Sequence, residues 1–302
     1  MSYRVAIFCL FLVAETIVYG QSKDMIFVSD TQAPMWVETL WLKSNHNQEA
    51  TGFLFRDIVK QHPAYLFILG DVVTLGYKKK KWSRMDRYLD SCRQAGIRVS
   101  ALLGNHDVMT RARKGESLFQ QRFPDHHRTG FYQVVDSVAV LFLNSNFKKL
   151  APADIQQQQE WLSTTLTALD EDPSILITVV ACHHAPYSNS TIVGSSEPVQ
   201  KYFVPSYLQS RKARLFITGH SHNYELFQRA GKDFLVIGGG GGLHQPLSEK
   251  PDRLFDLSSG YKPQFHYLVM QRNGGTLCLT SRYLLEDFSG FQEGLSFSIH
   301  YR

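Results

Sequence analysis

Hydrophobic and polar positions follow two periods along the chain, and together they predict strands that alternate with helices. Short apolar runs, MIFVSD at 25–30 and AYLFILGD at 64–71, end in an acid and are typical of buried strands. Between them, residues 49–62 place apolar side chains three and four positions apart, which predicts an amphipathic helix. The same spacing recurs in a helix whose apolar face is Trp82, Met85, Leu89 and Cys92. This alternation favours an α/β fold with a largely parallel, buried sheet.

The second half of the chain continues the pattern and ends in a strand-rich region. Residues 224–242 and 265–282 are predicted to form hairpins, and Asn273-Gly274 supplies a turn with positive φ in the second. No repeat or long linker interrupts the pattern, so we expect one domain over residues 24–302. Further strands are predicted at 97–107, 131–136, 138–146, 175–184 and 214–222, with helices at 154–169 and near 199–210.

The N-terminus has the features of a secretory signal peptide. Arg4 precedes an apolar run, Val5 to Ala14, and the small residue Gly20 comes before the polar QSKD. The run is shorter than the roughly 20 apolar residues that span a bilayer. We therefore expect residues 1–20 to be a signal peptide, the protein to be secreted or periplasmic, and the mature chain to lack a transmembrane segment. The alternative is that this stretch forms a strand or helix of the mature fold.

The composition is that of an ordinary globular protein with a mildly basic balance. Of 302 residues, 43% are hydrophobic and 20% charged, and the formal net charge is +5. The basic run Lys78–Lys81 is interpreted as a solvated loop, because strong nucleic-acid binding needs a basic stripe with aromatic stacking partners. No stable nucleic-acid partner is expected. The four cysteines contain no Cys-x-x-Cys pair, which argues against a zinc knuckle or a redox motif.

Polar side chains that can bind metal follow five of the predicted strands. In an open α/β sheet the carboxyl ends of the strands share one edge, so we expect these side chains to converge there. Carboxylates, imidazoles and amide oxygens are metal ligands, and five such clusters together predict a metal site. A single strand-end histidine is more often structural, and a single aspartate is more often a helix cap. The clusters are Asp30 and Gln32; Asp71; Asn105, His106 and Asp107; His183 and His184; and His220 and His222.

The alternation of side chains along a strand adds detail to this site. Asp30 and Gln32 are two positions apart, so on an extended strand end both face the same side. Adjacent residues face opposite sides, so only one of His183 and His184 is expected to reach the metal.

The motifs in their order resemble those of a known family. Asp-x-Gln, Gly-Asp, Gly-Asn-His-Asp, His-x-Pro and Gly-His-x-His occur here as DTQ, GD, GNHD, HAP and GHSH. The chain thereby resembles the calcineurin-like metallophosphoesterases over nearly all of its length after the N-terminal region. QQQQEWL before the strand at 175–184, and GHSHNYE leading to FLVIGGGGG, are most similar to the purple acid phosphatase branch.

The resemblance implies a four-layer α/β/β/α sandwich with a dinuclear metal site at the carboxyl ends of the strands. The His-x-Pro frame fits His184-Ala185-Pro186, so the resemblance favours His184 as a ligand, with His183 as a packed neighbour. It implies that Asp71 bridges the two ions. The first ion takes Asp30, Asp71, His222 and Gln32, and the second takes Asp71, Asn105, His184 and His220.

The resemblance also implies a mechanism. Two divalent ions, Mn, Fe, Zn or Mg, clamp the phosphate and activate a water that attacks in line. His106 is then no ligand but hydrogen-bonds the phosphoryl oxygen or protonates the leaving group, and Asp107 orients its ring. The alternative for Asp107 is a cap of a helix or loop.

Three features bear on the kind of metal site and on substrate contact. Gln32 stands where many relatives carry histidine, and its neutral amide oxygen favours Mn²⁺, Mg²⁺ or Fe²⁺ over Zn²⁺. Purple acid phosphatases carry a tyrosine three residues after the bridging aspartate, but here that residue is Thr74, so a ferric–tyrosinate site is not expected. The glycine run 238–242 fits either a tight turn or a close approach to phosphate.

Together these features predict a metal-dependent phosphoesterase, a hydrolase of phosphoric esters, and more specifically a phosphatase. Its expected partner is a phosphate-ester substrate. One alternative is a phosphodiesterase that acts on nucleotides or nucleic acid. Another is a non-catalytic binder on the same fold, which the intact ligand set and His106 disfavour. The sequence leaves open the leaving group, the oligomeric state and whether two cysteines pair.

Overall fold

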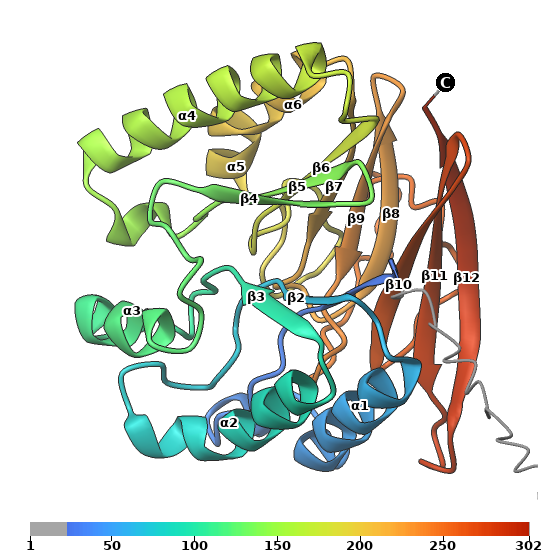
Figure 1. Cartoon of the computed structure of the whole chain (residues 1–302). Helices are drawn as coiled ribbons and strands as arrows, with labels where there is room; N and C mark the ends of the chain where they lie inside the picture. The colour runs from blue at the N-terminus through green and yellow to red at the C-terminus, as the bar shows by residue number, and fades with distance from the viewer. Residues whose placement is uncertain (1–22, 302) are drawn as a thin grey trace, which may run out of the picture.

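The computed structural model describes residues 23–301, and the expected signal peptide at 1–20 lies outside them. Two six-stranded sheets face each other, and helices cover the outer face of each sheet (Figure 1). The predicted four-layer α/β/β/α sandwich is therefore confirmed.

The first sheet combines a parallel half and an antiparallel half in the order β12-β11-β10-β1-β2-β3. The parallel strands β1, β2 and β3 come from the N-terminal third of the chain, and β10 joins them by pairing antiparallel with β1. The strands are β1 (Met25–Val28), β2 (Tyr65–Ile68), β3 (Arg98–Ala101), β10 (His266–Asn273), β11 (Thr276–Leu284) and β12 (Phe291–His300).

The second sheet has the order β4-β5-β6-β7-β9-β8. Its central strands β5, β6, β7 and β9 are parallel, and the two edge strands β4 and β8 pair antiparallel with their neighbours. The strands are β4 (Phe131–Val135), β5 (Val138–Phe142), β6 (Ile177–Ala181), β7 (Ala213–Thr218), β8 (Tyr224–Arg229) and β9 (Lys232–Ile237).

Side chains alternate along the buried strands, so each sheet packs on one core that it shares with the other sheet and on a second core under its own helices. In β1, Met25 and Phe27 pack between the two sheets, whereas Ile26 and Val28 pack under the helices on the outer face. This is why the central strands are apolar without interruption. The helices over the first sheet are α1 (Asn47–Gln61), α2 (Lys79–Gln94) and α3 (Ala112–Gln120), and those over the second are α4 (Pro152–Glu171), α5 (Glu197–Tyr202) and α6 (Val204–Gln209).

The structure differs from the expected elements in four places. The helix expected near 199–210 is two short helices, because Pro205 lacks an N–H and fits only in the first turn of α6. Helix α3 and strand β12 were not among the expected elements. Lys79–Lys81, interpreted as part of a solvated loop, form the first turn of α2. Two single turns of 3₁₀ helix, η1 (Glu38–Leu40) and η2 (Phe147–Lys149), lie in loops.

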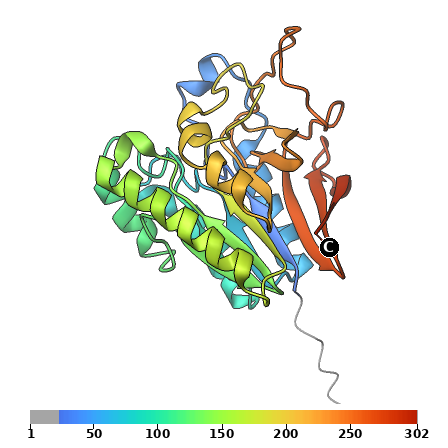
Figure 2. The same ribbon diagram turned by 90° about the horizontal axis from the view of Figure 1, so that it is seen from above.

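The carboxyl ends of the parallel strands of both sheets meet at one end of the molecule. Backbone hydrogen bonds join the segments just past the strands: Asp30 N donates to the Gly70 carbonyl at 3.1 Å, and Gly240 N donates to the Ser29 carbonyl at 2.8 Å. The second of these bonds links the two sheets. Figure 2 shows the long loops after β1, β6 and β9, in blue, yellow and orange, gathered at this end. We call it the carboxyl end of the sheets.

Among the described residues, the structure contains no disulfide and no helix that could span a membrane. Cys92, Cys182 and Cys278 are free thiols, the first two buried. Within residues 23–301, none of the helices combines the length and the apolar character needed to cross a bilayer.

Candidate metal centre

Four of the expected metal-binding side chains are set by left-handed turns just past the strands. Asp30, Asp71, His220 and His222 have φ angles of 60°, 49°, 71° and 50°. Strand β1 ends at Val28 and β7 at Thr218, so the alternation expected for an extended strand does not operate here. Non-glycine residues rarely adopt this conformation, and it concentrates at functional sites. The turns, rather than strand alternation, aim these side chains into one space.

Asp30 has one oxygen fixed and one oxygen without a partner. Its Oδ2 accepts a hydrogen bond from the backbone N–H of His220 at 2.9 Å. Its Oδ1 is fully buried, makes no hydrogen bond and lies 3.3 Å from Nε2 of His222. The His222 ring is held by a 2.6 Å hydrogen bond between Nδ1 and the Leu243 carbonyl, so Nδ1 carries the proton and Nε2 faces Asp30. An orphaned carboxylate oxygen beside a free imidazole nitrogen is what a cation site offers.

Gln32 completes this corner of the site. In the amide orientation that satisfies both of its ends, the nitrogen donates to the backbone carbonyls of Asp30 and Asp71, each at 3.0 Å. The amide oxygen then lies 3.3 Å from Nε2 of His222. Gln32 therefore points an oxygen at the same point as Asp30 Oδ1 and His222 Nε2.

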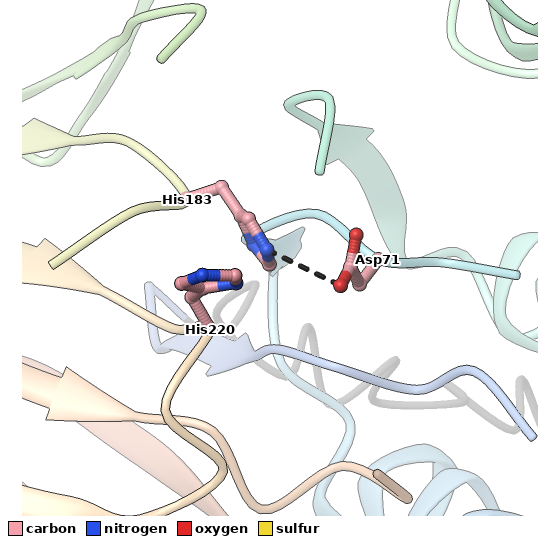
Figure 3. A group of neighbouring side chains, drawn as sticks. All are labelled: Asp71, His183 and His220. Atoms are coloured by element: carbon pink, nitrogen blue, oxygen red, sulfur yellow. Dashed lines mark ion pairs between the residues drawn. The ribbon is translucent and has the colours of Figure 1, made fainter. Parts of the chain in front are cut away.

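Asp71 joins this corner to a second cluster. Its Oδ1 accepts from the backbone N–H of His106 at 2.7 Å, and its Oδ2 lies 3.3 Å from Nε2 of His183. Figure 3 shows His183 and His220 converging on Asp71, with the ion pair from His183 dashed. Asn105 belongs to the same cluster, since its Oδ1 lies 3.1 Å from Nε2 of His183.

Two groups of side chains in the described part of the chain thus meet the distances expected of a metal site, and Asp71 belongs to both. One group is Asp30, Asp71 and His222; the other is Asp71, His183 and His220. Ligand atoms in each group lie within 4.8 Å of one another. The donor chemistry, carboxylates and imidazoles with Gln32 and Asn105 oxygens alongside, fits hard or borderline divalent ions.

The adjacent histidines occupy different positions. Nδ1 of His183 is bonded to the Leu69 carbonyl at 2.9 Å, an arrangement that leaves Nε2 facing Asp71, as in a metal-binding histidine. His184 lies further out, with Nδ1 2.8 Å from the hydroxyl of Ser145 and its ring 4.4 Å from that of His220. These distances place His183, the residue expected to be the packed neighbour, in the ligand cluster. His184 as a ligand stays a prediction.

The electrostatics of the cluster favour positive charge. Burial on its own would raise the pKa of Asp71, but His183 and His106 hold it well below its usual range. Burial would likewise lower the pKa of His183, but Asp71 and Asp30 raise it to about 9. Around them, burial and His183 lower the pKa of His184 to about 3. Burial and its histidine neighbours also keep the pKa of His220 well below its usual range. The carboxylates thus attract a cation, and the lowered pKa values of His184 and His220 favour the neutral imidazole that binds metal.

His106 lies beside the cluster without being part of it. Its Nδ1 is bonded to the Thr74 carbonyl at 3.1 Å, and its Nε2 lies 3.8 Å from Asp71 Oδ2 and 3.9 Å from Glu38 Oε1. The Thr74 carbonyl and Glu38 were not identified from the sequence, because neither is part of a recognisable motif.

The expected role of Asp107 needs a correction. Its carboxylate accepts hydrogen bonds from the backbone N–H groups of Val72, Val73 and Gly104, at 2.9–3.3 Å, and it does not hold the His106 ring. Asp107 therefore ties the loop after β2 to the loop after β3, which is the capping alternative. Burial, with the neighbouring Asp71 carboxylate, raises the pKa of Asp107 to about 7.

The glycine run is structural. Gly240 N donates to the Ser29 carbonyl at 2.8 Å and Gly242 N to the Asp30 carbonyl at 2.9 Å, so these N–H groups are engaged by the backbone. A Cβ on Gly242 would lie 2.4 Å from the His222 ring. The run therefore lets two strand ends pack closely behind Asp30 and His222.

An open cavity borders the second cluster. It has a volume of about 380 Å³ and combines ligand-type residues with apolar and basic ones. Its lining includes Asn105, His184, His220, Phe147, Lys148 and Val193.

Comparison with known proteins agrees with this fold. The family model for calcineurin-like phosphoesterases matches residues 25–224. Among curated proteins, none matches the chain in sequence.

Solved structures with low sequence identity share the fold. A purple acid phosphatase from yellow lupin seeds superposes with a TM-score of 0.70 at 15% identity, over 92% of this chain and 53% of the lupin chain. This chain thus spans about half the length of the lupin enzyme. The Plasmodium protein GAP50, an anchor in the inner membrane complex, superposes with a TM-score of 0.65 at 14% identity, over 92% of this chain and 89% of the GAP50 chain. A dimetal phosphatase from Danio rerio superposes with a TM-score of 0.56 at 12% identity, over 92% of this chain and 99% of the Danio chain.

Gly104 packs so closely on Asp71 that its substitution tests how Asp71 is positioned. A Cβ at this position would lie 2.1 Å from both the backbone N and the Oδ1 of Asp71, so Gly104→Ala must displace Asp71. We expect metal affinity to fall at least about tenfold, with destabilisation on the order of 1–3 kcal/mol from the overpacking. The matched control is Gly290→Ala, because a Cβ at Gly290 meets no atom within 4 Å. Calorimetric metal titration and urea unfolding of both variants measure the difference. Wild-type metal affinity in Gly104→Ala would show that the close packing does not position Asp71.

Proposed function

Because the chain belongs to the calcineurin-like phosphoesterase family, we propose that it is a metal-dependent phosphatase with two divalent ions. The observation that carries the proposal is the position of Asp71, which both candidate ligand groups share. Two metal ions held by one common carboxylate would suit phosphoryl transfer, because together they can act on the attacking and the leaving oxygen.

We assign the ligands from these distances and from the family motifs. Asp71 would serve both ions. The first ion would be held by Asp30, Gln32, Asp71 and His222, and the second by Asp71, Asn105, His220 and one histidine of the pair His183 and His184. His183 is favoured by its 3.3 Å distance to Asp71 Oδ2, and His184 by the His-x-Pro frame of the sequence.

When bound, the two ions supply electrostatic stabilisation of the phosphoryl group and acidify the attacking water. The chain's own residues do the rest. Asn105 and His184 line the cavity of about 380 Å³ and so border the space for the substrate. His106, fixed through Nδ1 by the Thr74 carbonyl, presents Nε2 beside Asp71, where it can protonate the leaving-group oxygen.

The substrate class proposed is a phosphoric monoester. The cavity beside the second cluster has room for an organic leaving group, and Lys148 at its lining matches an anionic substrate. A phosphodiesterase is the alternative. The proposal includes export directed by residues 1–20 and a catalytic domain at 24–302.

The function is tested by hydrolysis of generic chromogenic mono- and diesters with metal-stripped protein. We expect no turnover without metal, recovery on adding back Mn²⁺, Zn²⁺ or Mg²⁺, and faster turnover of the monoester. His106→Gln should keep both ions and lower kcat by roughly 10²–10⁴-fold, because a proton donor and not a ligand is lost. Full turnover after chelation would refute the proposed metal dependence. Loss of an ion from His106→Gln would make His106 a ligand instead.

The two adjacent histidines are separated by single substitutions. We expect His183→Ala to lose one of the two ions, because His183 Nε2 lies within 3.3 Å of Asp71 and 3.1 Å of Asn105. His184→Ala is expected to keep both ions. Metal content after dialysis, measured by plasma mass spectrometry on variants whose circular dichroism matches wild type, gives the answer. The reverse pattern would assign the ligand to His184, as the sequence frame favours.

A further inference from the structure

Large apolar side chains are exposed mainly at the carboxyl end of the sheets. Among residues 23–301, eight large hydrophobic side chains are exposed, and six of them lie in loops at this end. The other two, Tyr132 and Val134, lie on the edge strand β4. The six are Trp36, Leu40 and Trp41 after β1, Ile192 after β6, and Phe255 and Leu257 after β9.

The loop after β1 carries the densest group. We call residues 35–43 the docking segment. Trp36 is 77% exposed, Trp41 65% and Leu40 64%, all within six residues of chain. Scattered single apolar residues on a surface are ordinary, but a contiguous group that includes two exposed indoles marks an interaction site.

The docking segment has its acid on the inner side and its base on the outer side. Its one acid, Glu38, turns inward: Oε2 accepts from the backbone N–H of Met35 at 2.6 Å, and Oε1 lies 3.9 Å from Nε2 of His106. Its one base, Lys43, is exposed. The outward surface of the segment is therefore apolar and cationic.

Further lysines border the same end. Lys80 and Lys81 line a cavity together with Ala33, which lies two residues before the docking segment. Lys148 and Lys149 line the cavity beside the metal cluster. The loop after β9 is balanced, with Glu249, Lys250, Asp252 and Arg253.

We propose that the docking segment binds the surface of an anionic phospholipid bilayer. Indole rings have an apolar body and a polar N–H, which suits them to the boundary between headgroups and acyl chains. Lysines at the rim add attraction to anionic headgroups. A protein partner or a second copy of the chain would be expected to present acids to these lysines, whereas an anionic bilayer needs no matched surface.

Docking through this segment turns the metal cluster toward the bilayer. The segment begins three residues after Gln32, and its Glu38 lies beside His106. The proposal stands on exposure and charge, so it does not depend on whether the site hydrolyses esters.

Vesicle binding by the full chain tests the proposal. Vesicles of equal parts phosphatidylcholine and phosphatidylserine are expected to bind the wild type, with much weaker binding to phosphatidylcholine alone and at high salt. The double variant Trp36→Ser/Trp41→Ser is expected to bind at least about tenfold more weakly, since each indole buried contributes on the order of a tenfold factor. Its matched control is Tyr132→Ser/Val134→Ser, which removes two exposed apolar side chains from β4 and is expected to bind as wild type.

A local readout separates this surface from any other membrane contact. Brominated lipid should quench the fluorescence of the wild type and not that of Trp36→Ser/Trp41→Ser, because Trp82 is buried in the core and Trp161 lies on α4. Absence of quenching in the wild type, or equal vesicle binding by both double variants, would overturn the proposal. So would concentration-dependent self-association, in sedimentation equilibrium, that the Trp36→Ser/Trp41→Ser variant abolishes.

Discussion

The interaction on which the site depends is the burial of Asp71 between two sets of cation-binding side chains. A buried carboxylate is costly unless positive charge compensates it. Here Oδ1 is tied to the backbone N–H of His106, and Oδ2 faces His183. The Oδ1 of Asp30 is also buried without a hydrogen-bond partner, so it too needs a compensating positive charge. Both candidate groups of ligand atoms include this shared acid, so bound cations would compensate its buried negative charge.

The scaffold holds this arrangement at a cost in backbone strain at the strand ends. Asp30, Asp71, His220 and His222 all adopt left-handed φ angles, at roughly 1–2 kcal/mol each. The two-sheet core, with its outer helices, is the rigid support that offsets this strain. Gly104 and Gly242 then allow the turns to approach each other more closely than any Cβ would permit. The site is thus determined by loop geometry just beyond the regular strands.

Much of the fold and site could be predicted from sequence because the signals were local. Apolar periodicity located β1, β2 and the helix with Trp82 on its inner face, and strand-end polar residues located Asp30, Asp71 and His222. The reason given for Asp30 and Gln32 was wrong, because left-handed turns replace strand alternation after Val28. The positions of His183 and His184 and the function of Asp107 depend on contacts between distant loops, such as the bond from Val72 to Asp107. Such contacts leave no periodic or spacing signal in the chain.

The central claim is that two ions share Asp71, and metal stoichiometry tests it most directly. Metal-free wild type, Asp30→Asn and Asp71→Asn are titrated with Mn²⁺ by calorimetry, with circular dichroism to confirm the fold. The shared-carboxylate arrangement predicts two equivalents for wild type, one retained by Asp30→Asn, and weakened binding of both by Asp71→Asn. If Asp71→Asn lost one ion and bound the other with wild-type affinity, Asp71 would serve a single ion and the dinuclear arrangement described here would be wrong.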